Sequence, residues 1–127
     1  MPTHTKGKVM IVDDDEEILE LVSMILKIHG YETVMVNNGK NLIEKINEFK
    51  PHTILLDIQL AEMDGRLVCK EIKEIKEHCN VSVILFSANG YYAKTAKDYL
   101  CDDFMHKPFD METLVTMIGR RTPQAQE

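Results

Sequence analysis

Five short apolar runs alternate with five amphipathic segments along the chain, and this alternation limits the fold more than any other feature. Nearly continuous apolar runs are typical of strands that are covered on both faces. The intervening segments place apolar residues three and four positions apart, as the buried stripe of a helix requires. Because crossovers between parallel strands are right-handed, the pattern predicts a doubly wound α/β fold, a five-stranded parallel sheet with helices on both faces. The predicted strands are 8–12, 31–36 (nearer an edge), 53–56, 81–86 and 104–106.

The helices have recognisable ends. Asp14 or Asp15 can cap the first helix, and Gly30 can end it in a left-handed conformation. Pro51 stops the second helix, which follows the turn at 37–39. Segment 91–100 has the poorest apolar stripe and predicts a weakly anchored helix. The last helix begins to end at Gly119, before a frayed tail from Thr122. The predicted buried stripes are Ile18, Leu21, Val22 and Ile25; Leu42, Ile43, Ile46 and Phe49; Val68, Ile72, Ile75 and Cys79; and Met111, Leu114, Val115 and Ile118.

Length and composition predict one domain over 1–127, with an ordered core at about 7–121 and short polar termini. The 127 residues are 44% apolar and carry a net charge of −6, which argues against direct binding to nucleic acid or to an anionic membrane. We expect no membrane span and no secretory signal, and therefore a cytoplasmic protein. The cysteines, which lack C-x-x-C spacing, are interpreted as buried or indifferent thiols; they are Cys69, Cys79 and Cys101.

Polar residues follow four of the predicted strands. Asp13 and Asp14 come after the first strand, Asp57 after the third, Ser87 after the fourth and Lys107 after the fifth. In a doubly wound sheet, sites lie outside the carboxyl ends of the strands, where the strand order reverses. Each residue alone has a simpler interpretation as a helix cap, a turn, a strand-end hydroxyl or a strand stop. Their shared position at successive strand ends favours a site.

These residue types suit phosphoryl transfer to Asp57. Clustered carboxylates repel one another, and a hard divalent cation such as Mg²⁺ relieves the repulsion through oxygen ligands. Lys107 carries a point charge suited to a phosphoryl oxygen or a carboxylate, and the Ser87 hydroxyl can donate a hydrogen bond to a phosphoryl oxygen. We therefore hypothesise that Asp57 becomes covalently phosphorylated.

At these residues the chain resembles the receiver domain of two-component response regulators, over about Lys8 to Ile118. The resemblance implies a CheY-like sheet of strand order 2-1-3-4-5, the order for which a receiver of this family serves as a general example. The motifs that carry it are Ile11-Val12-Asp13-Asp14-Asp15, Leu55-Leu56-Asp57, Met63-Asp64-Gly65, Phe86-Ser87-Ala88, Asp102-Asp103-Phe104 and Lys107-Pro108-Phe109.

The resemblance implies that a histidine kinase or a histidine phosphotransfer protein phosphorylates Asp57. Asp14, Asp57 and the main-chain carbonyl of Gln59 would ligate Mg²⁺ or Mn²⁺, with Asp13 acting mainly through water. Lys107, joined to Pro108 by a cis bond, would contact the phosphoryl group. Ser87 would close on a phosphoryl oxygen while Phe104 changes rotamer. This would alter the face of the fourth helix, fifth strand and fifth helix for a downstream effector. By the same resemblance, Gln59 and Asn89 would occupy the positions that tune phosphate lifetime in the family.

Some residues depart from the commonest family pattern. Ala61 replaces a proline in the loop after Asp57, and Ser87 replaces a threonine but keeps the hydroxyl. Leu100 and Cys101 stand where Gly-Ala is common. Phe104 lacks a tyrosine hydroxyl, so any switch there depends on burial alone.

Two alternatives remain open. One is an interaction module on the same fold that is not phosphorylated. The other is an enzyme or cofactor-binding protein, against which stand the missing G-x-G-x-x-G, the acidic first strand–helix turn and the missing second aspartate of a D-x-D phosphohydrolase. We expect no enzymatic activity beyond self-phosphorylation and self-dephosphorylation, and no dedicated DNA-binding output.

Overall fold

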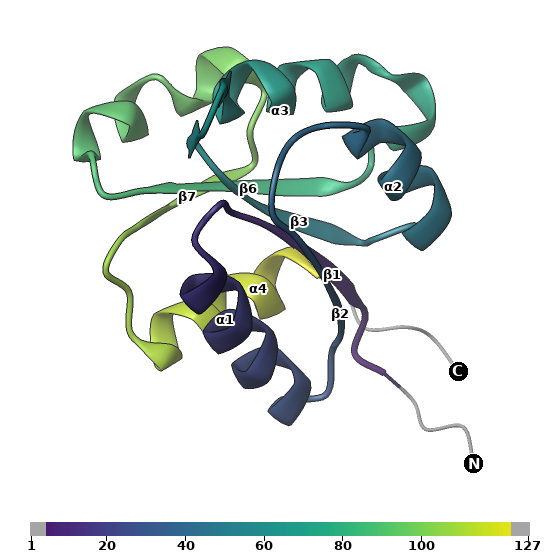
Figure 1. Cartoon of the computed structure of the whole chain (residues 1–127), viewed down its shortest axis with the longest axis vertical. Helices are drawn as coiled ribbons and strands as arrows, with labels where there is room; N and C mark the ends of the chain where they lie inside the picture. The colour runs from purple at the N-terminus through teal and green to yellow at the C-terminus, as the bar shows by residue number, and fades with distance from the viewer. Residues whose placement is uncertain (1–4, 123–127) are drawn as a thin grey trace.

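A five-stranded parallel sheet runs through the molecule in the order β2-β1-β3-β6-β7 (Figure 1). The computed structural model describes residues 5–122. The two-residue strands β4 (Gln59–Leu60) and β5 (Met63–Asp64) form a separate antiparallel hairpin. With this hairpin set aside, the order is 2-1-3-4-5, and the predicted doubly wound parallel fold is confirmed. The strands of the main sheet are β1 (Lys8–Val12), β2 (Glu32–Val36), β3 (Thr53–Asp57), β6 (Ser82–Ser87) and β7 (Asp103–His106).

Helices cover both faces of the sheet (Figure 1). On one face, α1 (Glu16–Ile28) and α4 (Met111–Arg121) pack against Val9 and Ile11 of β1. On the other face, α2 (Leu42–Phe49) and α3 (Gly65–Glu74) pack against Met10 and Val12. Successive side chains of a strand point to opposite faces, so both sets must be apolar. This is why the strands appear in the sequence as continuous apolar runs.

Asp15 and Gly30 define the two ends of α1, and the choice of Asp15 as the cap leaves Asp14 available for other contacts. The Asp15 side chain is the N-cap and accepts hydrogen bonds from the N–H groups of Glu17 and Ile18, at 3.0 and 3.4 Å. Asp14, the other predicted cap, stays exposed and unused by the helix. Gly30 has a φ of +98°, the left-handed conformation predicted at the end of this helix.

The predicted helix over 91–100 is wrong in type. The chain forms two short 3₁₀ helices, η2 (Gly90–Lys94) and η3 (Ala96–Tyr99). Their bonds span three residues, such as Thr95 N–H to the Tyr92 carbonyl at 3.2 Å. Ala96 is buried and its neighbours are half-buried or exposed. Such a segment lacks the apolar burial that stabilises an α-helix against shorter, tighter turns.

The stripe predicted to end at Cys79 also ends early. α3 stops at Glu74, Ile75 takes an extended conformation, and η1 (Lys76–His78) follows. Cys79 is exposed, whereas His78 is buried. The His78 imidazole bonds the Asn47 side chain of α2 at 2.8 Å, a tertiary contact that helical periodicity does not reveal.

The last helix is longer than predicted. α4 continues to Arg121, two residues beyond Gly119. Thr122 is buried and its hydroxyl bonds that of Thr53, so fraying does not begin there. The rest of that prediction, at 123–127, lies outside the described residues.

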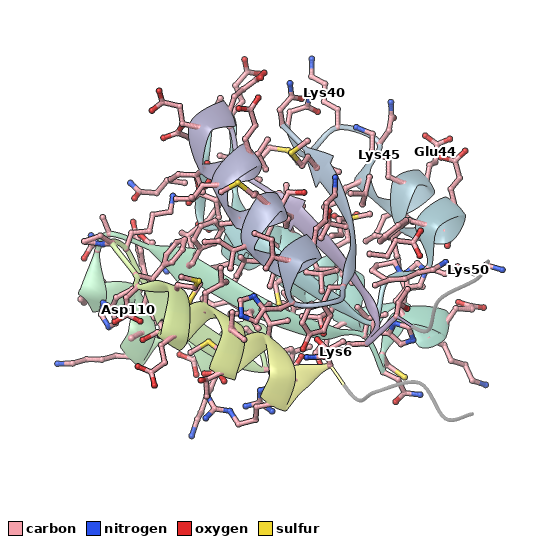
Figure 2. The ribbon with its side chains drawn as sticks, turned by 90° about the horizontal axis from the view of Figure 1, so that it is seen from below. Lys6, Lys40, Glu44, Lys45, Lys50 and Asp110 are labelled. Carbon is pink, nitrogen blue, oxygen red and sulfur yellow. The ribbon has the colours of Figure 1, made fainter. Side chains whose placement is uncertain are left out.

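Charged side chains project outward from α2 and from the turn that precedes it. Glu44 and Lys45 of α2 project away from the sheet, and Lys40 projects from the turn before α2 (Figure 2). Within residues 5–122, none of the helices has the length and apolarity needed to cross a membrane.

Leu100 follows η3 in a strained conformation, which can be tested. Its φ is +66°, a conformation that non-glycine residues rarely adopt, while its side chain is 45% exposed. We expect Leu100→Gly to stabilise the protein by about 0.5–1 kcal/mol, because relief of strain exceeds the small loss of burial. Chemical denaturation measures this.

The matched control is Leu67→Gly, at a leucine of similar exposure (57%) inside α3. Glycine in a helix interior costs about 1 kcal/mol, so this variant should lose stability. Equal losses in both variants would contradict the strain at Leu100.

Candidate phosphoacceptor and metal site

Four of the predicted site groups meet at the carboxyl ends of the strands. Asp13 directly follows β1, Asp57 ends β3, and Ser87 ends β6. Lys107 follows β7, whose last residue, His106, lies beside Ser87 in the sheet register. The parallel sheet therefore brings together residues that are as many as 94 positions apart, as in the Lys107–Asp13 contact.

Two buried carboxylates share one ammonium group at the centre of the site. Asp13 is 0% exposed and Asp57 4% exposed. Lys107 Nζ lies 3.0 Å from Asp13 Oδ2 and 3.5 Å from Asp57 Oδ1. One cation for two anions leaves the site negatively charged, and Asp14 adds a third carboxylate nearby.

The position of Lys107 is set from two further sides. Its ammonium lies 4.4 Å from the centre of the Phe86 ring, a favourable cation–π contact. The main-chain N–H of Lys107 donates to the Ser87 carbonyl at 3.0 Å. The Lys107–Pro108 peptide bond is cis, as the resemblance implies. Main-chain and ring contacts together aim the side chain across the strand ends toward Asp13 and Asp57.

Burial and charge repulsion raise the pKa of Asp57 to about 6. Loss of solvation is the largest cause, and the Asp13 carboxylate adds to it. The Lys107 ammonium and the Gln59 N–H, which bonds Asp57 Oδ1 at 3.1 Å, act in the opposite direction. The net rise means that the existing partners do not fully compensate the Asp57 charge.

The donor set fits a hard divalent cation. Asp13, Asp14 and Asp57 each offer a carboxylate oxygen, and these atoms all lie within 4.8 Å of one another. Oxygen ligands, a cluster of negative charge and an exposed member open to water match the needs of Mg²⁺, which keeps several of its waters. The uncompensated charge of Asp57 gives a physical reason for a cation to bind.

Ser87 and Gln59 are linked across the rim of the site. The Ser87 hydroxyl donates to Gln59 Oε1 at 3.2 Å and accepts the Asn89 N–H at 3.1 Å. The Asn89 side chain in turn accepts the Tyr91 N–H and caps η2. Sequence reasoning placed Gln59 and Asn89 near the site but missed the Gln59 side-chain bond to Ser87, because no local pattern signals it.

The sequence identified Gly65 as part of the Met63-Asp64-Gly65 motif but did not reveal the steric reason for a glycine at this position. A β-carbon at Gly65 would clash with the Asp57 carbonyl oxygen and lie 2.8 Å from Ile58 Cα. The Gly65 N–H bonds the Ile58 carbonyl at 2.7 Å. The loop after Asp57 thus folds back onto the main chain that carries the carboxylate.

Phe104 lies away from the charged cluster. It is half-buried on β7 and packs against the core on the α2–α3 face. Its ring lies 5.0 Å from that of His106 in an edge-to-face arrangement. Phe104 shares this core cluster with Tyr92 and Ala96 of the 3₁₀ segment.

The thiols take no part in this site. Burial raises the pKa of Cys69 to about 12 and that of Cys101 to about 11, so both are poor nucleophiles. Cys79 is exposed on the turn after η1.

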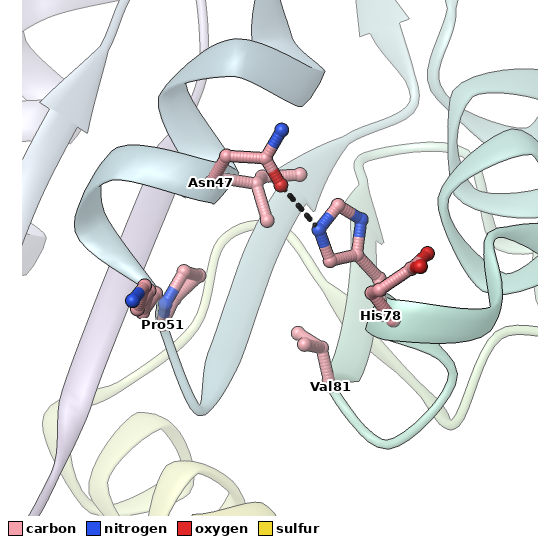
Figure 3. A pocket seen from close by; sticks show the side chains of 7 residues that line it. Asn47, Pro51, His78 and Val81 are labelled. Carbon is pink, nitrogen blue, oxygen red and sulfur yellow. Dashed lines mark hydrogen bonds between the residues drawn. The ribbon is translucent and has the colours of Figure 1, made fainter.

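A separate pocket lies beside His78 (Figure 3). Pro51 and Val81, which precede β3 and β6, line it together with Asn47 and His78. It therefore lies at the amino ends of the strands, away from Asp57. Among residues 5–122, His78 Nδ1 is a buried side-chain atom without a hydrogen-bond partner.

Comparison with known proteins identifies the family. The model of the response regulator receiver domain matches residues 9–119, so the chain belongs to the receiver domains of two-component response regulators. The crystal structure of the receiver domain of NtrX from Brucella abortus is 31% identical, with a TM-score of 0.81 over 90% of this chain and 97% of that chain. Fold, strand-end residues and family model agree.

Two regulators from bacteria are also similar in sequence. AtoC of Escherichia coli, a regulatory protein, is 30% identical over 117 residues, which are 90% of this chain and 25% of AtoC. PhoP of Bacillus subtilis, a transcriptional regulatory protein of alkaline phosphatase synthesis, is 29% identical over 118 residues, 91% of this chain and 49% of PhoP. The chain thus spans about a quarter of one regulator and about half of the other.

The raised pKa of Asp57 predicts a pH-dependent cost to stability. The folded state binds this proton more tightly than the unfolded chain, whose pKa is near 3.8. Stability should therefore fall as the pH rises from about 4 through 6 and stay lower above it. Without divalent cations, Asp57→Asn should be more stable than the wild type at pH 7–8, on the order of 2 kcal/mol. Denaturant unfolding across this pH range measures the difference.

The control for this experiment is Asp14→Asn, because Asp14 is exposed and its charge costs little without a cation. Adding Mg²⁺ should stabilise the wild type more than either variant. A wild type that is as stable as Asp57→Asn at pH 8 without cations would contradict the uncompensated charge.

Gly65→Ala should destabilise the protein by about 2–4 kcal/mol, because the new methyl group meets the Asp57 main chain. Gly119→Ala is the control. A β-carbon there has 3.6 Å to its nearest neighbour, the Tyr31 hydroxyl, and lies inside α4. It should be neutral or stabilising by about 0.5–1 kcal/mol. Thermal unfolding compares the two, and a similar Tm for both would refute the close approach at Gly65.

Proposed function

We propose that Asp57 is the phosphoacceptor of this receiver domain. The donor is the phosphohistidine of a sensor histidine kinase or a histidine phosphotransfer protein, in the presence of Mg²⁺ or Mn²⁺. The supporting observation is the position of the Asp57 carboxylate. It is 4% exposed, ends a central strand, lies 3.5 Å from Lys107 Nζ and shares a cluster with Asp13 and Asp14.

The step exchanges one phosphorus bond for another. An Asp57 carboxylate oxygen attacks the phosphorus while the bond from phosphorus to the donor imidazole nitrogen breaks. An acyl phosphate forms on Asp57, and the imidazole leaves with a proton from solvent. Charge spreads over the three outer phosphoryl oxygens in such a transfer, so fixed positive groups and hydrogen-bond donors accelerate it.

The residues around Asp57 can supply these groups. Lys107 pairs with both carboxylates before phosphorylation and would contact a phosphoryl oxygen afterwards. Ser87 would donate its hydroxyl hydrogen to another. Asp14, Asp57 and the Gln59 carbonyl would hold the cation, with Asp13 mainly through water. When bound, the cation neutralises the clustered carboxylates and the charge of the phosphoryl oxygens.

The output would arise at the face formed by η2, η3, β7 and α4. Movement of Ser87 toward the phosphoryl group would carry the following residues of η2 with it, because Asn89 bonds both Ser87 and Tyr91. Phe104 packs beside this segment and can respond to its displacement. A downstream effector protein would bind the changed face, or the phosphoryl group would pass onward in a relay, in the cytoplasm.

Phosphorylation of Asp57 is directly testable. Incubation with acetyl phosphate and Mg²⁺ should add one phosphoryl group to the wild type and none to Asp57→Asn, because the amide is not a competent nucleophile. Intact-protein mass spectrometry measures the product. Asp98→Asn, at an exposed aspartate of η3, serves as the control and should be labelled like the wild type. Labelling of Asp57→Asn to the same extent would eliminate the proposal.

A further inference from the structure

Ser87 has one hydroxyl hydrogen, and the structure shows where that hydrogen goes. It is donated to Gln59 Oε1 at 3.2 Å, while Ser87 Oγ accepts the Asn89 N–H at 3.1 Å. Ser87 is 0% exposed. A buried hydroxyl without an acceptor for its hydrogen is unfavourable, so the Gln59 bond contributes to keeping Ser87 in this position.

Gln59 holds Asp57 and Ser87 at the same time. Its main-chain N–H bonds Asp57 Oδ1 at 3.1 Å, and its side chain bonds Ser87. Gln59 begins β4, in the hairpin that Gly65 keeps against the Asp57 main chain. The main chain of Gln59 is therefore fixed, whereas its exposed side chain can leave Ser87 without disturbing the core.

We propose that Gln59 is a positioning residue whose side chain latches Ser87 in the unphosphorylated state. A phosphoryl oxygen on Asp57 and Gln59 Oε1 would compete for the same hydroxyl hydrogen. Ser87 can serve one of them at a time, so Gln59 must release it when the phosphoryl group is engaged. The latch rests on the proposed phosphorylation of Asp57 and adds a residue that sets how readily the switch operates.

The latch has a limited strength, which makes it tunable. A net hydrogen bond of this kind corresponds to roughly a 2- to 10-fold change in an equilibrium constant. Removing the acceptor should therefore favour the phosphoryl-engaged state by that factor. Gln59→Met is suited to this purpose, because it keeps the chain length, the N–H to Asp57 and the main-chain carbonyl while it lacks Oε1.

The experiment is a double-mutant cycle between Gln59→Met and Ser87→Ala, with beryllium trifluoride and Mg²⁺ as the phosphoryl mimic. The dissociation constant of the mimic is measured by amide chemical shifts for the wild type, both single variants and the double variant. Gln59→Met should bind the mimic roughly 2- to 10-fold more tightly than the wild type. The same substitution should have no effect in the Ser87→Ala background, where there is no hydroxyl to release.

The cycle separates the latch from other roles of Gln59. If Gln59 only shields the phosphoryl group from water or supports the loop, its substitution will change binding equally in both backgrounds, and the latch is overturned. Unchanged affinity in Gln59→Met also overturns it. Gln59→Ala also removes the acceptor and guards against new contacts made by the methionine side chain. Its effect on mimic binding must likewise disappear in the Ser87→Ala background. Failure of the wild type to bind the mimic would refute the phosphoacceptor proposal itself, and the latch with it.

Discussion

The pairing of one ammonium group with two buried carboxylates determines the charge balance of the site at the strand ends. Lys107 Nζ lies 3.0 Å from Asp13 and 3.5 Å from Asp57 at the carboxyl ends of three strands. Burial, together with repulsion from Asp13, outweighs the attraction of the Lys107 ammonium and raises the pKa of Asp57 to about 6. A site in this condition gains from a bound cation and is sensitive to any change in its own charge. Covalent modification of Asp57 would alter that balance directly.

Hydrogen bonds and ring contacts connect the carboxylate site to the surface of the molecule. The loop after Asp57 is pressed against the strand end at Gly65, and Gln59 on that loop bonds Ser87. A second connection begins at Arg66, whose guanidinium pairs with Asp64 and stacks 4.5 Å from the Tyr92 ring. Both connections reach the 3₁₀ segment η2–η3, which buries little apolar surface. A weakly packed element beside a rigid site can have two arrangements of similar free energy.

Periodicity predicted elements well where burial alone decides them. The central strands follow their apolar patterns because both faces of the sheet are covered. In α1 the predicted stripe is right at Val22 and Ile25 but wrong at Leu21, which is 47% exposed while Leu19 and Leu26 are buried. Periodicity failed at 91–100, where too little apolar surface is buried to favour an α-helix over 3₁₀ turns. It failed again at Cys79, because α3 ends at Glu74 and the chain then buries His78, which bonds Asn47 of α2, and leaves Cys79 exposed. The roles of Gly65 and of the Gln59 side chain also depend on distances between segments, which a linear pattern does not contain.

The sequence by itself determined the sheet, the family resemblance and the positions of Asp13, Asp57, Ser87 and Lys107 at successive strand ends. It could do so because strand period and strand direction place such residues at one edge without knowledge of any distance. Only the tertiary structure decided that Lys107 is shared between Asp13 and Asp57, that Asp15 caps α1 and leaves Asp14 free, and that Gln59 holds the Ser87 hydroxyl. Those outcomes depend on a few tenths of an ångström between side chains, the scale on which charge pairing and hydrogen bonding are set.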